Sequence, residues 1–182
     1  YNTLFSIQCM VEFGKNTQAV QMLAAYIDLL KRTLHVGREL IPLKEEFENT
    51  EKYLVLQQIR YGNKIQYKCE MEKETEKLLV PALIIQPLVE NAIFHGLKPK
   101  AANCLLQITG RCGEDCVDLY IRDNGVGFDP GQTAPKTSPI STGIGLSNVN
   151  ERIQLYFGKH YGAYITSVPR TGTEVHIHLP KL

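Results

Sequence analysis

Four polar side chains interrupt an otherwise apolar stretch at residues 84–96. Asn91 and His95 stand four residues apart, and Gln86 and Glu90 form a second pair with the same spacing. Residues four apart lie on the same face of a helix, so each pair is expected to point in one direction. Buried polar groups either find partners within the protein or are presented to a ligand. A core helix with satisfied polar residues and a ligand-binding helix both fit this stretch alone.

Two glycine-rich turns follow, and they favour the ligand-binding alternative. Asp123 precedes Gly125 and Gly127 at the end of an expected strand, and Gly143 and Gly145 precede an expected helix. Glycine lets backbone N–H groups approach phosphate oxygens, and the start of a helix adds positive potential. A carboxylate at a strand end can accept a hydrogen bond from the exocyclic amine of adenine, whereas guanine has a carbonyl there. The turns therefore predict a site that selects an adenine nucleotide.

The polar helix can supply a ligand for the metal ion that accompanies a nucleotide. Mg²⁺ takes oxygen ligands from phosphates, waters and a few protein groups, and the carboxamide of Asn91 suits this role. The chain has neither a G-x-x-x-x-G-K-[ST] loop nor a G-x-G-x-x-G loop, which excludes P-loop proteins and kinases with a glycine-rich loop. The ordered set of Asn91, Asp123 and the two glycine turns is the strongest functional signal.

The first third of the chain has the periodicity of helices. Helices are expected over residues 2–13, from Thr17 to Gly37, and over residues 43–61. Apolar residues in the second of these follow the 4-3-4 spacing of a helix that packs lengthwise on another helix. An intramolecular core and a dimer interface both fit this seam, which consists of Leu23, Ile27, Leu30 and Leu34.

The period changes after Gly62, and an antiparallel or mixed sheet with helices on one face is expected. Pro81 is expected to open the polar helix, with Pro87 as a kink or as a second helix start. The chain as a whole is therefore expected to be α+β, with an N-terminal helical hairpin or bundle segment and then a two-layer α/β sandwich. The expected elements are a strand from Ile65, a hairpin of 106–111 with 117–122, a helix at 147–157, and strands at 163–168 and 173–179.

Composition limits the alternatives further. The formal net charge of +1 over 182 residues argues against a nucleic-acid-binding protein with a basic face. No apolar run is long enough to span a membrane. Among five scattered cysteines, Cys112 and Cys116 flank a probable hairpin turn and could form half a metal site. No second pair or histidine cluster completes that site in the sequence, so ordinary hairpin cysteines are the favoured interpretation.

Together these motifs resemble the Bergerat-type ATP-binding fold shared by gyrase B, Hsp90, MutL and the histidine kinases. More narrowly, the sequence is similar to the LytS/YesM-like sensor histidine kinases over essentially the whole chain. The residues that carry the resemblance are Gln86-Pro87-Leu88-Val89-Glu90-Asn91-Ala92-Ile93 with His95-Gly96, Asp123-Asn124-Gly125-Val126-Gly127-Phe128, Gly143-Ile144-Gly145-Leu146-Ser147-Asn148-Val149 with Glu151-Arg152, Gly172-Thr173, Tyr1-Asn2-Thr3-Leu4 and Tyr53-Leu54.

The resemblance implies three catalytic candidates on the polar helix. Asn91 ligates Mg²⁺, Glu90 lies beside it and polarises groups near the γ-phosphate, and His95 approaches the phosphates. Gyrase-like members carry a Glu four residues before the Asn, where this chain has Pro87. This difference favours phosphoryl transfer to a side chain over hydrolysis of ATP.

The same resemblance implies ATP and Mg²⁺ as cofactors and gives the residues that bind the nucleotide. Asp123 holds adenine, the first glycine turn shapes the base pocket, and the second faces the phosphates. Residues 129–142, rich in Pro, Gly, Ser and Thr, are expected to form a lid that is mobile without nucleotide. The binding candidates are Asp123, Gly125, Gly127, Gly143, Gly145, Leu146 and Thr173.

By the resemblance, residues 1–62 are an incomplete dimerisation and histidine-phosphotransfer segment, and residues 63–182 are the ATP-binding catalytic domain. In these kinases the phosphoacceptor histidine lies in a Pro-His-Phe-like motif just before the Tyr-Asn-Thr-Leu sequence. The chain begins at Tyr1, so we expect a fragment that binds ATP but does not autophosphorylate. Four other histidines are expected to be surface residues and not replacements for the phosphoacceptor: His35, His160, His176 and His178.

The expected function is the kinase core of a two-component sensor histidine kinase. In the intact protein the phosphoryl group passes from ATP to a histidine and then to a response regulator, and the N-terminal helices form a homodimer. We expect a cytoplasmic fragment whose parent is anchored in the cell membrane through upstream segments. An ATPase or anti-sigma-factor-type serine kinase of the same fold is a second alternative, and a scaffold that binds no nucleotide is a third.

Overall fold

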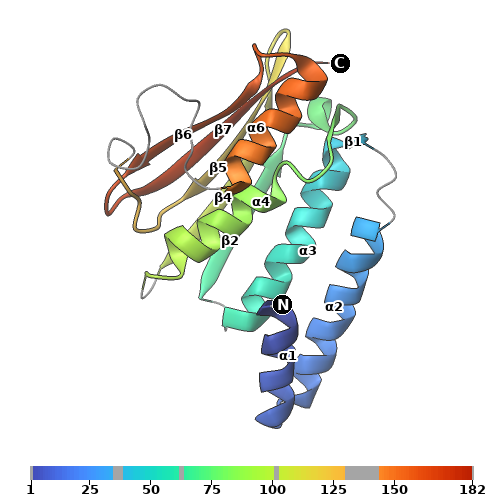
Figure 1. Ribbon diagram of the computed structural model, residues 1–182, viewed down its shortest axis with the longest axis vertical. Coiled ribbons are helices and arrows are strands. Elements are labelled where there is room, and N and C mark those ends of the chain that lie inside the picture. The colour runs from blue at the N-terminus through green and yellow to red at the C-terminus, as the bar shows by residue number, and fades with distance from the viewer. Residues whose placement is uncertain (1, 35–38, 62–63, 101–102, 130–143, 182) are drawn as a thin grey trace.

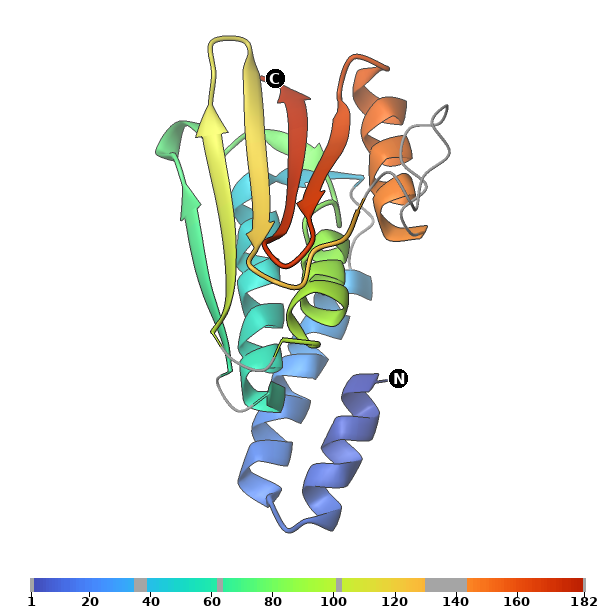
Figure 2. The ribbon, with the colours of Figure 1, turned by 90° about the vertical axis from the view of Figure 1, so that its left-hand side faces the viewer.

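The computed structural model of the chain describes residues 2–34, 39–61, 64–100, 103–129 and 144–181. Its N-terminal third is helical, and its C-terminal part is a sheet with helices on one face (Figures 1 and 2). This order confirms the expected α+β architecture of a helical segment followed by a two-layer sandwich. Within those ranges, no helix combines the length and the apolar character needed to cross a membrane.

The first two helices, α1 (Asn2–Glu12) and α2 (Asn16–Leu34), form a hairpin that extends away from the sheet (Figure 2). This agrees with the helical periodicity of the sequence. In the predicted seam of α2, Leu23 and Ile27 are each 41% exposed, and the side chains of the other two seam residues lie outside the described ones. The hairpin therefore leaves apolar side chains of its seam uncovered within the described chain.

The third helix, α3 (Leu43–Tyr61), packs against the sheet and contributes to its core. Phe47, Tyr53 and Leu54 are each at most 5% exposed and belong to one hydrophobic cluster with the inner face of the sheet. The apolar spacing of the sequence predicted this helix over the same residues. The predicted division of the chain after residue 62 stays a prediction.

The main sheet has five strands in the order β2-β4-β5-β7-β6. β2 pairs in parallel with β4, and the other neighbours in this order pair antiparallel. In β5 the buried residues Val117, Leu119 and Ile121 alternate with more exposed ones, so one face packs on helices and the other faces outward. The strands are β2 (Ile65–Met71), β4 (Cys104–Cys112), β5 (Cys116–Asp123), β6 (Gly162–Val168) and β7 (Gly172–Pro180).

The inner face of the sheet is covered by α3, by α6 (Ile144–Phe157) and by the polar helix of the sequence analysis (Figure 1). That polar helix consists of α4 (Gln86–Asn91) and of η2 (Ala92–Leu97), a π-helix that continues it without a break. Its apolar residues, such as Leu88 and Ile93, are almost completely buried in the common core. A short 3₁₀ turn, η1 (Lys73–Thr75), follows β2.

The start of the polar helix differs from the first expectation. Pro81 does not open the helix but ends β3 (Leu79–Pro81), which pairs antiparallel with β1 (Leu40–Pro42). The helix begins at Gln86, and Pro87 occupies its first turn, where a missing N–H costs no helical hydrogen bond. The alternative that Pro87 marks a helix start is therefore correct. The two strands of this small ribbon were not predicted because each has only three residues.

The segment between β3 and α4 is held by a buried carboxylate. Glu46 of α3 is 1% exposed and accepts hydrogen bonds from the N–H groups of Leu83, at 3.1 Å, and Ile85, at 2.9 Å. Arg152 of α6 donates to the carbonyl of Ala82 at 2.5 Å. Burial raises the pKa of Glu46, against the opposing effects of the amide hydrogen bonds and the charge of Arg152. Side chains from two helices therefore fix the residues that lead into the polar helix.

We expect Glu46→Ala to destabilise the fold by about 2–5 kcal/mol, because it leaves two buried N–H groups without their acceptor. Urea unfolding followed by circular dichroism measures this change. Glu48→Ala is the matched control, since Glu48 lies on the same helix but is exposed, and its effect is expected to stay within about 0.5 kcal/mol. Equal stability of the two variants would contradict a fixing role for Glu46.

Candidate functional site

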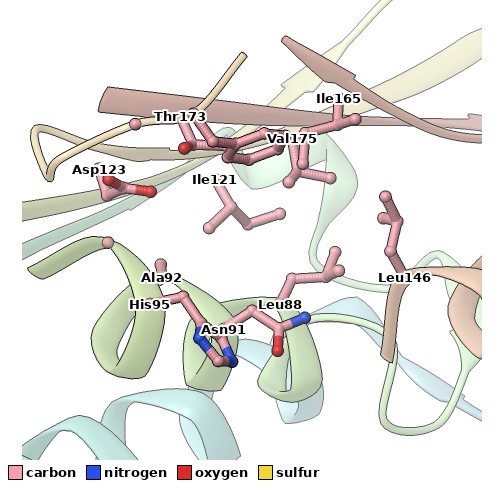
Figure 3. A pocket seen from close by; sticks show the side chains of 13 residues that line it. Leu88, Asn91, Ala92, His95, Ile121, Asp123, Leu146, Ile165, Thr173 and Val175 are labelled. Carbon is pink, nitrogen blue, oxygen red and sulfur yellow. The ribbon is translucent and has the colours of Figure 1, made fainter. Parts of the chain in front are cut away.

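A cavity of about 480 Å³ lies between the inner face of the sheet and the polar helix, beside the start of α6 (Figure 3). This volume falls within the usual range for small-molecule sites, roughly 300–1,000 Å³. Its walls are mostly apolar, and a few polar side chains converge on it. Those polar side chains are Asn91, His95, Asp123 and Thr173.

The helical side of the cavity carries Asn91 and His95 (Figure 3). Asn91 ends α4, and His95 lies in η2. Their predicted common face is confirmed, because both line the same cavity. Among the described residues, the side chain of Asn91 has no hydrogen-bond partner, so its carboxamide is available to a ligand.

Glu90 does not line the cavity, although it precedes Asn91. Its carboxylate accepts a hydrogen bond from the side-chain amide of Gln86 at 2.9 Å, which joins the second polar pair of the sequence. Burial, and then the charge of Glu90, raise the pKa of Tyr53 on α3, so Glu90 lies near that helix. A role for Glu90 next to the γ-phosphate stays a prediction.

The sheet side of the cavity carries Asp123 at the end of β5, across from Asn91 (Figure 3). Its carboxylate accepts a hydrogen bond from the N–H of Gly125 at 2.8 Å. Burial raises the pKa of this carboxyl, against amide hydrogen bonds from Gly125 and Thr173 and the charge of Lys100. A half-buried carboxylate at the edge of an apolar cavity is a strong acceptor for any donor that enters.

The turn after β5 packs closely against the end of η2. A Cβ on Gly125 would lie 2.3 Å from the carbonyl oxygen of Gly96, and a Cβ on Gly96 would lie 2.6 Å from Asp123 Oδ1. The N–H of Val126 donates to the carbonyl of Gly96 at 3.0 Å. Packing between backbones therefore requires glycine at position 125, which does not line the cavity. Gly127 does line it, with a φ of 58° that favours glycine.

Ser167 of β6 connects the two segments that border the sheet side of the cavity. Its hydroxyl accepts a hydrogen bond from the N–H of Phe128 at 2.9 Å and donates to the carbonyl of Gly172 at 3.1 Å. It also lies 3.0 Å from the hydroxyl of Thr173, which lines the cavity as a predicted binding residue. Sequence reasoning did not find Ser167, because a single serine in a strand pattern carries no signal of its partners.

The start of α6 forms a third side of the cavity. Leu146 is 2% exposed and lines the cavity. A Cβ on Gly145 would lie 2.9 Å from the amide nitrogen of Asn91, so a larger residue there would press on the Asn91 side chain. Gly145 itself is not part of the lining. Gly143 and all but the first residue of the predicted lid lie outside the described residues.

The apolar wall of the cavity was only partly predicted. Ile121, Ile165 and Val175 project from three neighbouring strands toward the polar helix (Figure 3). The alternation of apolar and polar residues predicted that Ile121 and Val175 lie on one face of their strands, but no such prediction was made for Ile165. The alternation did not predict that helices leave part of this face open. The cavity therefore joins a carboxylate acceptor at one edge, an apolar wall, and an amide with an imidazole on the opposite side.

Two family profiles match the chain. Residues 1–65 match "Histidine kinase", and residues 77–182 match "Histidine kinase-, DNA gyrase B-, and HSP90-like ATPase". The second match covers more than half of the chain and contains the complete cavity lining.

Individual relatives and a solved structure agree with the profiles. The chain is 33% identical to the sensor histidine kinase YesM of Bacillus subtilis over 180 residues, and 32% identical to the sensor protein LytS of Bacillus anthracis over 186 residues. Each comparison covers 99% of this chain and 31% of the relative, so the chain spans about a third of these relatives. Histidine kinase ThkA, in complex with response regulator protein TrrA, matches in fold with a TM-score of 0.55 and 19% identity, over 100% of this chain and 58% of ThkA.

These matches confirm the resemblance that the motifs around Asn91, Asp123 and Gly145 carried. The fold, the two profiles and the full-length matches of this chain to YesM and LytS agree with one another. The chain therefore belongs to the family of histidine kinase-, DNA gyrase B-, and HSP90-like ATPases through residues 77–182, and it is similar to sensor histidine kinases over its whole length.

Proposed function

We propose that the chain is the kinase core of a two-component sensor histidine kinase and that it binds Mg-ATP in the cavity between the sheet and the polar helix. In the intact protein the γ-phosphoryl group passes to a histidine and then to a response regulator. The observation that carries this proposal is the arrangement of Asp123 across one apolar cavity from Asn91 and His95. An ATPase-family domain with these groups has the parts that a nucleotide needs at both of its ends.

The base end of the nucleotide lies at Asp123 in this proposal. The carboxylate accepts a hydrogen bond from the exocyclic amine of adenine, and the apolar side chains of Ile121 and Val175 contact the ring. Guanine offers a carbonyl where adenine offers the amine, and two acceptors repel each other. The half-buried carboxylate therefore favours ATP over GTP, because it accepts from the adenine amine but faces the guanine carbonyl as a second acceptor.

The phosphate end lies toward Asn91, His95 and the start of α6. The residues present fit a magnesium ion, since Asn91 offers one carboxamide oxygen without a competing partner among the described residues. When bound, Mg²⁺ supplies charge neutralisation to the phosphates. The 14-residue helix α6 adds the positive potential of its N-terminus, and the exposed His95 can donate to a phosphate oxygen.

The position four residues before Asn91 favours phosphoryl transfer over hydrolysis. Pro87 occupies that position in the first turn of α4, and proline has no group that could activate a water. This argues against an ATPase of the gyrase type. The helical prefix α1–α3 argues against a serine kinase of the same fold, and the open cavity argues against a scaffold without nucleotide.

We also propose partners for the intact protein. ThkA is a histidine kinase whose solved complex contains a response regulator, and we propose a regulator of that kind as the next phosphoryl acceptor here. Leu23 and Ile27 on α2 are exposed apolar residues that suit a homodimer interface of the intact protein. We further propose that this part of the protein lies in the cytoplasm and that other segments of the parent protein anchor it in the membrane.

Asp123→Asn is expected to weaken ATP binding by about tenfold, because it replaces a charge-assisted hydrogen bond worth roughly 1.5–3 kcal/mol with a neutral one worth roughly 0.5–1.5 kcal/mol. Isothermal titration calorimetry with ATP and GTP measures the effect and the base selectivity. Asp115→Asn is the control, since Asp115 is an exposed residue of the hairpin at the opposite end of β5. Equal ATP affinity of the wild type and Asp123→Asn would refute the adenine contact.

The pH dependence of ATP affinity is a second test of the hydrogen bond between Asp123 and adenine. The ionised carboxylate accepts the hydrogen bond of the amine more strongly than the protonated carboxyl does, and burial raises the pKa of Asp123. Affinity in the wild type is therefore lost as the pH falls through that raised pKa, at a higher pH than an ordinary Asp would give. Asp123→Asn has no such group, so the difference in affinity between the two proteins should shrink as the solution is acidified.

The 182-residue chain is expected to bind Mg-ATP but to gain no phosphohistidine, because none of its five histidines lies in the Pro-His-Phe-like acceptor motif. Positioning of the nucleophile supplies most of the catalysis in phosphoryl transfer. Incubation with γ-labelled ATP, followed by acid and base stability tests of the label, measures this. A longer chain that carries the motif should become labelled.

Asn91→Ala should abolish labelling of that longer chain, because the metal ligand is lost, while Mg²⁺-free nucleotide still binds. Stoichiometric acid-labile label on the 182-residue chain would show that the acceptor is one of its own histidines. Full labelling of the longer chain with Asn91→Ala would show that Asn91 is not the metal ligand.

A further inference from the structure

The outer face of the sheet, opposite the helices, carries a cluster of metal-ligating side chains. Along β5, the side chains between the buried residues point to this face, and they include Cys116 and Asp118. The register pairs Asp118 with His178 of β7, and Tyr120 with His176. The two histidines lie 58 and 60 residues from Asp118 in the sequence, which is why the sequence did not reveal the cluster.

Asp118 is the centre of this cluster. Its Oδ1 lies 2.6 Å from Nε2 of His176 and 2.8 Å from Nδ1 of His178, and the Cys116 thiol donates to its Oδ2 at 3.7 Å. One donor atom each from Cys116, Asp118 and His178 lie within 4.8 Å of one another. In the parts of the chain that the structure describes, no other three His, Cys, Asp or Glu side chains meet this spacing.

Aromatic neighbours hold both imidazole rings in place. His176 stacks on Tyr120 with ring centroids 4.7 Å apart and an interplanar angle of 7°. His178 stacks on Tyr161 at 5.5 Å and 25°. The backbones of β5 and β7 are paired along this whole region, so the ligand atoms come from a rigid surface. A metal ion would therefore bind without ordering a loop, which lowers the entropic cost of binding.

The ligand types select a borderline transition metal. One thiol, one imidazole and one carboxylate are the three kinds of side chain that bind zinc, at about 2.0–2.3 Å from the metal. Tetrahedral geometry with these bond lengths puts ligand atoms about 3.3–3.8 Å apart. The Cys116–Asp118 separation of 3.7 Å falls within this range, and the Asp118–His178 separation of 2.8 Å is shorter than it. Mg²⁺ and Ca²⁺ prefer oxygen ligands alone, so this set disfavours them.

We propose that Cys116, Asp118 and His178 bind a zinc ion on the outer face of the sheet, with water as the fourth ligand. Zinc replaces the thiol proton of Cys116, which passes to the solvent. It also binds Nδ1 of His178, whose proton, donated to Asp118 in the structure, moves through solvent to Nε2 so that the ring stays neutral. His176 is a positioning residue, because its hydrogen bond to Oδ1 orients the carboxylate of Asp118. The bound ion joins β5 to β7.

This zinc site is separate from the proposed nucleotide site. Both use β5, but Asp123 ends the strand at the cavity, and Asp118 lies five residues earlier on the opposite face. Five residues of strand span about 17 Å. The zinc site therefore needs no nucleotide, and its existence can be tested whether or not the proposed function is correct.

Cobalt is the probe, because thiolate ligation of Co²⁺ produces a charge-transfer band in the near ultraviolet. The reduced, chelator-treated chain is titrated with Co²⁺ and then with Zn²⁺. We expect one equivalent of Co²⁺ to produce the band and one equivalent of Zn²⁺ to abolish it. Cys116→Ser should lose the band. His178→Phe keeps a ring for stacking on Tyr161 and should weaken binding by about tenfold or more.

Cys112→Ser is the matched control, since the register pairs Cys112 with the inward-facing Val117; it should keep the band. Zinc should raise the melting temperature of the wild type but not of His178→Phe, which separates metal loss from misfolding. The proposal is wrong if the band survives in Cys116→Ser, if it is lost in Cys112→Ser, if excess Mg²⁺ displaces cobalt, or if saturation needs millimolar metal.

Discussion

The buried carboxylate of Glu46 is the interaction on which the geometry of the cavity depends. It joins α3 to the segment that leads into α4, while Arg152 joins the same segment to α6. Asn91 and His95 follow on the helix that this segment begins. Since Asp123 is fixed separately by the sheet, the distance across the cavity is set by where Glu46 and Arg152 hold the helix. Burying a carboxylate costs free energy, and the hydrogen bonds that Glu46 accepts from two backbone N–H groups compensate part of that cost.

The opposite end of the polar helix is fixed by close backbone packing, which only glycines allow. Gly96 and Gly125 bring the end of η2 into backbone contact with the turn after β5. Near α6, Gly145 leaves room for the Asn91 side chain. The helix thus touches the sheet closely at Gly96 and stands away from it near Asn91, and the apolar space between them is the cavity. Glycines that resemble a phosphate-binding signature therefore also act as spacers in the packing.

Most of the fold followed from the sequence, because long elements with clear periodicity determine it. α3, the β4–β5 hairpin and the last two strands lie where the spacing of apolar residues predicted them. Predictions failed where contacts across the chain decide the outcome: Pro81 lies in a strand because it pairs with Leu40, and Ser167 gains its role from partners on other segments. The polar residues of the cavity were found through motifs, whereas its apolar wall depends on which part of the sheet the helices leave open.

We propose that one cavity holds a whole Mg-ATP, with adenine at Asp123 and the phosphates toward Asn91. A crystal structure of the chain grown with Mg²⁺ and a non-hydrolysable ATP analogue tests it most directly. In that structure we expect the adenine amine within hydrogen-bond distance of the Asp123 carboxylate, and the metal on the carboxamide oxygen of Asn91. A nucleotide bound elsewhere, or bound with its base toward Asn91 and its phosphates toward Asp123, would contradict this placement of ATP.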